Sequence, residues 1–179
     1  MEETKMKKLI LILLLLLVFP LSCLAKPVIK CDRQTFDPIT LTYYLEGNVS
    51  VDTGKRLITA NKAKVELYSL EVYAEGEITL TQDNIVFTGD AVHVTGSDKT
   101  AVVTGNVNFA ENGVNIKADR GSFNWGTKDA LFEGKVRIKA EDVHFTENTS
   151  ELLKSGKDEN GGVTTERIIY NVRSKKFHD

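Results

Sequence analysis

The sequence predicts an all-β fold, an elongated and twisted antiparallel β-jellyroll or solenoid-like stack built from ~29-residue repeats. Three observations predict it. Small residues recur at a fixed period, apolar and polar residues alternate within each repeat, and no segment after residue 26 shows helical periodicity. We therefore expect successive copies to stack as rungs of antiparallel strands around one elongated apolar interior.

Two series of small residues carry the period. The first consists of glycines spaced 29 residues apart, each followed by a polar residue and then Val or Ile: Gly47, Gly76, Gly105 and Gly134. The second series has the same spacing: Cys31, Ala60, Gly89 and Ala118. Because the two series run in step, they indicate a true internal repeat. Cys31 is then interpreted as a small residue of the interior, not as half of a disulfide.

Each repeat alternates with a period of two residues, which is typical of half-buried strands. In the third copy Val103, Gly105, Val107 and Phe109 share one face, which is apolar in every copy, whereas the opposite face is mostly polar. After each residue of the second series, the apolar face moves to the other parity. Such a switch predicts a corner or a bulge in the strand.

The N-terminus resembles an export signal. Basic residues precede an apolar run, residues 9–19, and Pro20 and the small residues around Ala25 follow it. We expect residues 1–25 to be a signal peptide cleaved after Ala25. An uncleaved membrane anchor is the alternative, and Pro20 argues against lipidation at Cys23. Residues 26–179 are expected to form a single domain with a polar loop at 148–162.

Composition and motifs argue against catalysis, metal binding and nucleic-acid binding. The chain has 23 basic and 25 acidic residues and a formal net charge of -2, which does not favour a nucleic-acid partner. The three histidines, His93, His144 and His178, lack metal-ligand spacing, and no nucleophile elbow or phosphate-binding loop occurs. We expect no catalytic residue, no metal and no cofactor. His93 and His144 are predicted to lie on the polar strand face.

A stack of rungs also predicts a partner. Its terminal strands present unpaired backbone groups unless a segment folds over them as a cap. Pairing with another chain at these edges would add strands head to tail.

The repeated sequence segments resemble those of the LptA/OstA-like family of periplasmic lipopolysaccharide-transport proteins, which carry an organic solvent tolerance-like domain. The resemblance rests on segments such as Glu46-Gly47-Asn48-Val49 and Ala118-Asp119-Arg120 through Phe123, and it covers roughly residues 28–175. It implies a twisted, slightly open jellyroll that binds the acyl chains of lipid A inside. It also implies a place in the periplasm, end-to-end association, and partners at the inner and outer membranes. A sister component that stays anchored on the periplasmic side of the inner membrane is the alternative.

Periodicity selects the positions expected to line the lipid groove: Val49, Ile78, Phe87, Val107, Phe109, Ile116, Phe132, Val136 and Ile138. The same positions would equally suit a core filled by side chains. Ala and Gly at repeated positions favour free space. Two other functions stay open at this point: an exported structural or adhesive repeat protein, and a solenoid enzyme, for which clustered acids or bases would be expected.

Overall fold

The computed structural model describes residues 28–52, 54–140, 144–145 and 162–178. Within them the strands form one 12-stranded sheet, in the order β1-β3-β4-β5-β6-β7-β8-β9-β11-β12-β10, with β2 also paired to β3. The strands are β1 (Val28–Lys30), β2 (Arg33–Asp37), β3 (Thr42–Asp52), β4 (Leu57–Glu66), β5 (Glu71–Gln82), β6 (Ile85–Thr95), β7 (Thr100–Glu111), β8 (Val114–Asn124), β9 (Asp129–Ala140), β10 (His144–Phe145), β11 (Val163–Asn171) and β12 (Lys176–His178). The expected signal peptide and all but Gly162 of the expected 148–162 loop lie outside the described residues.

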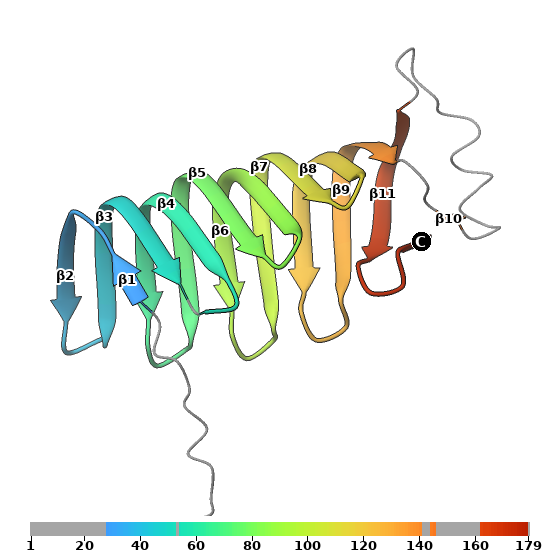
Figure 1. Cartoon of the computed structure of the whole chain (residues 1–179). Coiled ribbons are helices and arrows are strands. Elements are labelled where there is room, and N and C mark those ends of the chain that lie inside the picture. Colours follow the sequence, from blue (N-terminus) through green and yellow to red (C-terminus); the bar gives the residue numbers. More distant parts are fainter. Residues whose placement is uncertain (1–27, 53, 141–143, 146–161, 179) are drawn as a thin grey trace, which may run out of the picture.

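The predicted fold class is confirmed. From β3 to β9, consecutive strands pair antiparallel and stack side by side along one axis (Figure 1). The short β10 is a local exception, because it pairs parallel with β12. β11 continues the antiparallel pairing at the C-terminal end. Ala130 of β9 pairs with Phe123 of β8 on one side and with Tyr170 of β11 on the other.

Neighbouring long strands shift register at the level where the sequence predicts a corner. The extra residue, however, lies in the strand that carries the first-series glycine and not in the strand where the apolar parity switches. Between β7 and β8 the register passes from Thr104↔Arg120 to Val107↔Ala118, so β7 carries one extra residue. Gly105 and Asn106 supply this bulge with successive left-handed conformations, φ 73° and 48°. A Cβ on Gly105 would lie 2.3 Å from Asp90 Oδ2, so the close approach also requires glycine.

The bends fold the sheet into two arms. The first arm ends in the hairpin turns along the lower edge of Figure 1: 38–41, 67–70, 96–99, 125–128 and 172–175. The second arm ends in the turns 54–56, 83–84 and 112–113. The inner faces of the arms meet in one hydrophobic core that extends from Leu45 to Phe177. Pairs such as Phe87 and Phe109, which lie opposite each other across strands, make up this core.

The bend can be tested with two glycines that share a left-handed φ. Gly113 (φ 84°) lies in a hairpin turn, where an added Cβ would meet open space, whereas Gly105 (φ 73°) faces Asp90. We expect Gly113→Ala to lower the free energy of unfolding by about 1 kcal/mol through backbone strain alone. Gly105→Ala should cost at least about 1 kcal/mol more, because it also displaces Asp90 from Asn106, 2.9 Å away. Urea unfolding measures both, and equal costs would contradict this explanation of the bend.

Candidate functional site

The ends of the two arms, where the hairpin turns lie, approach each other on the side opposite the bends. We call this side the mouth. A cavity of about 230 Å³ lies there, lined by Gln82 and Ile85 of the second arm and by Phe123 and Val172 of the first. Further along, the Arg56 guanidinium lies 4.4 Å from the centre of the Trp125 ring, which joins a second-arm turn to a first-arm turn. Arg56 Nε also donates a hydrogen bond to Gln82 Oε1 at 2.7 Å.

Polar contacts close the mouth in the C-terminal half. The Tyr170 hydroxyl donates a hydrogen bond to Glu111 Oε2 at 2.9 Å, and Lys175 Nζ donates to the other carboxylate oxygen. Glu111 is buried at the end of β7, so these two partners satisfy a carboxylate removed from water. Burial, and then the hydrogen bond to Glu111, raise the pKa of the Tyr170 hydroxyl.

Aromatic rings fill the interior behind this closed part of the mouth. The Phe109 ring lies 5.6 Å from Phe87, 5.3 Å from Phe132 and 6.0 Å from Tyr170. Tyr170 in turn lies 4.9 Å from Phe177. All five side chains are fully buried. Packed aromatic side chains therefore fill this part of the interior.

The N-terminal part of the interior is more open. Tyr43, Val65, Val72 and Val94 lie next to one another across β3, β4, β5 and β6, and all four face inward but are only half-buried. Small side chains such as Ala63 occupy the next inward positions. This stretch therefore presents apolar surface that the fold itself does not cover.

Exposed apolar side chains border this open stretch on the first arm. We call them the apolar rim: Ile39, Leu41, Leu67, Tyr68 and Leu70. Ile39 is 92% exposed, Tyr68 91% and Leu70 63%. Their two turns are adjacent, since Leu67 N donates a hydrogen bond to Leu41 O at 3.1 Å. A contiguous exposed apolar patch of this kind marks an interaction site.

The repeat provides an internal control for the rim. One position in each first-arm turn has a left-handed backbone: Leu41 (φ 52°), Leu70 (57°), Lys99 (55°), Lys128 (73°) and Lys175 (57°). Three equivalent turns thus form with lysine, so folding does not require leucine there. Leucine is also poorly suited to this conformation. The apolar rim is therefore best explained by a ligand or a partner.

The nine predicted groove positions all lie on the inner face. Each is at most 2% exposed, and all belong to the single core cluster. Val49 and Ile78 lie on the second arm towards the N-terminal end, and the other seven lie on strands β6 to β9. Whether any of them contacts lipid stays a prediction.

The apolar rim was not predicted from the sequence. Strand periodicity selects inward positions and ignores turns, whereas the rim lies in turns. Comparing turns across the 29-residue period would have found it, because Leu41 and Leu70 align with Lys99 and Lys128.

Metal-ligating side chains do not gather in the described part of the chain, where no group of three or more His, Cys, Asp or Glu could hold an ion. No helix among the described residues is long and apolar enough to cross a membrane. His93 is half-buried on the outer face, stacked 4.2 Å from Tyr73 and 3.1 Å from Glu71 Oε2.

Comparison with known proteins bears on the fold. No family model matches the chain, and no curated protein sequence matches it. Among solved structures it is similar to LptH of Pseudomonas aeruginosa, described as the LptA homologous periplasmic component of the lipopolysaccharide transport device. The TM-score is 0.52 at 13% identity, covering 55% of this chain and 75% of that one. The chain therefore has an LptA-like fold.

The closed part of the mouth predicts a pH dependence of stability. Because folding raises the pKa of Tyr170, the folded chain keeps this proton at a pH where the unfolded chain has lost it. Stability should therefore fall as pH rises above ~10, by up to ~1.4 kcal/mol per pH unit from this group. Urea unfolding between pH 8 and 11 checks this, with Tyr170→Phe as the control. If the variant shows the same decline as the wild type, Tyr170 does not contribute.

Proposed function

We propose that this chain is a non-catalytic carrier of lipopolysaccharide that binds acyl chains of lipid A at the open N-terminal stretch of its interior. The observation that carries the proposal is the apolar rim beside the half-buried residues Tyr43, Val65, Val72 and Val94. The LptA-like fold supports it, since a protein of this fold is a component of a lipopolysaccharide transport device.

The free energy of burying apolar surface is sufficient for lipid binding without a catalytic step. Each acyl methylene moved from water to an apolar surface contributes about 0.8 kcal/mol. The rim and the inner face together form an apolar path from the turn tips to the interior. Because the closed half is filled, acyl chains would enter beside the rim and lie against the first rungs.

We further propose that the protein acts in the periplasm, between inner-membrane and outer-membrane components, and associates end to end. The terminal strand β2 supports this, because four of its five residues are exposed and, among the strands that the structure describes, it pairs only with β3. A second chain could extend the sheet at this edge through backbone hydrogen bonds.

Replacing the rim tests the binding site. Leu41→Asn with Leu70→Asn removes two apolar side chains, and asparagine suits the left-handed backbone at both positions. We expect lipid A binding to weaken at least about tenfold, because the acyl chains lose apolar contact. Equilibrium binding of purified protein to lipid A measures this.

The matched control removes exposed apolar residues elsewhere. Leu57 (39% exposed) and Val86 (36%) lie on the second arm, away from the rim. Leu57→Asn with Val86→Asn should leave the affinity unchanged within about twofold. No binding by the folded wild type would remove the carrier function and favour a structural or adhesive one. Equal weakening by both pairs of substitutions would contradict the proposed site.

A further inference from the structure

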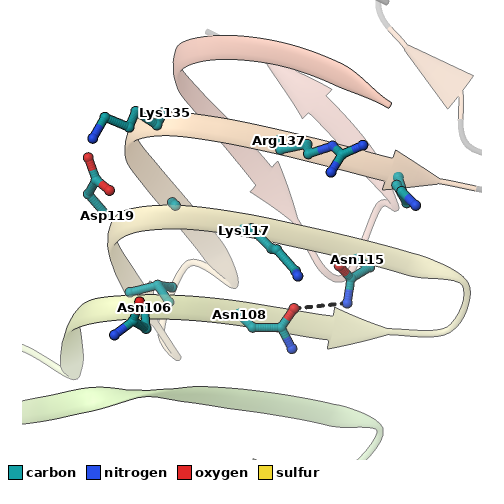
Figure 2. A pocket seen from close by; sticks show the side chains of 10 residues that line it. Asn106, Asn108, Asn115, Lys117, Asp119, Lys135 and Arg137 are labelled. Carbon is teal, nitrogen blue, oxygen red and sulfur yellow. Dashed lines mark hydrogen bonds between the residues drawn. The ribbon is translucent and has the colours of Figure 1, made fainter. Parts of the chain in front are cut away.

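A second hollow lies on the outer face of the second arm, near the C-terminal end of the stack (Figure 2). Its volume is about 690 Å³, and four cationic side chains line it: Lys117, Lys135, Arg137 and Lys139. Asp119, at the bend, is the one carboxylate among its lining residues. The chain as a whole has a net charge of -2, so this concentration of positive charge is local.

Strand register brings the cations together. Lys117 of β8 lies directly opposite Arg137 of β9, and Lys139 follows two residues later on the same face. Side chains opposite each other in a sheet have Cβ atoms about 4.5–5.5 Å apart, and like charges there are destabilising. Packing of the sheet therefore does not explain these cations.

The repeat again supplies a comparison. One period earlier, the residue equivalent to Lys117 is Thr88, and Ala110 is equivalent to Lys139. Asn108 is likewise equivalent to Arg137. The fold thus forms with neutral side chains at these positions, and positive charge accumulates only on β8 and β9.

The lysines are available to a ligand. Within the described ranges, Lys117, Lys135 and Lys139 form no ion pair, whereas Arg120 on the same strand β8 pairs with Glu133 at 2.5 Å. Lys117 and Lys139 are also exposed. Amide groups complete the lining, with Asn115 Nδ2 donating to Asn108 Oδ1 at 3.0 Å.

We propose that this hollow binds the phosphate groups of anionic lipid headgroups at a bilayer surface. Phosphate oxygens accept charge-assisted hydrogen bonds from ammonium and guanidinium groups, and asparagine amides suit the polar remainder of a headgroup. A bilayer presents many such phosphates together, and each Lys or Arg near an anionic bilayer contributes about 1 kcal/mol. The inference is independent of the carrier function, because the hollow lies on the outer face and not at the mouth.

Vesicle binding tests the proposal. The probes are vesicles of phosphatidylcholine containing phosphatidylglycerol, and vesicles of phosphatidylcholine alone. Lys117→Thr with Lys139→Ala introduces the residues found one period earlier, so the sheet should fold. We expect wild type to bind the anionic vesicles, and the variant to bind them about 30-fold more weakly, since two charges are lost. Raising the salt concentration should weaken wild-type binding.

A control variant that loses the same number of positive charges elsewhere distinguishes binding at this hollow from an effect of the net charge of the protein. Lys55 and Lys99 are exposed lysines in turns away from the hollow, so Lys55→Thr with Lys99→Asn should retain wild-type binding. Equal losses in the two variants would overturn the site, as would a wild type that binds pyrophosphate but not anionic vesicles. Lipid A binding through the mouth should be unchanged in Lys117→Thr with Lys139→Ala, so this proposal and the carrier function can fail separately.

Discussion

A pair of successive left-handed residues in every second long strand, β3, β5, β7 and β9, determines the architecture. Gly105 and Asn106 illustrate the device, in which one extra residue bends the strand while its neighbour stays paired. Because the bend recurs at one position in every rung, the bends align and fold one sheet into two arms. Without them the strands would form an open twisted sheet with one uncovered apolar face. The interior, the mouth and the outer faces all follow from this constraint.

The same scaffold serves two purposes along its length. At the C-terminal half Phe87, Phe109 and Phe132 are fully buried, and each such ring contributes about 1.5–3 kcal/mol relative to an exposed one. This half stabilises the stack. At the N-terminal end, smaller side chains and half-buried valines leave apolar surface uncovered. A packed half can therefore support an uncovered apolar surface on the first rungs.

Much of the fold could be predicted from the sequence. The contacts between the two arms could not, for a physical reason. Local rules revealed the rungs and the bends, because glycine spacing and alternating parity reflect interactions between neighbouring strands. The contact between Glu111 and Tyr170 joins residues 59 positions apart. It depends on how far the twist staggers one arm against the other, which no local pattern encodes. For the same reason periodicity placed Phe132 and Ile138 inward without showing that their half of the interior is filled.

The central claim is that acyl chains lie against the N-terminal rungs. A lipid A analogue with a nitroxide on one acyl chain would test it, through paramagnetic broadening of the methyl NMR signals of the protein. We expect broadening at Leu41, Leu67, Leu70 and Val65, and undisturbed signals from Ile116, Val136 and Ile138. Broadening confined to the latter three would contradict the claim, because it would place the acyl chains in the half that aromatic rings fill.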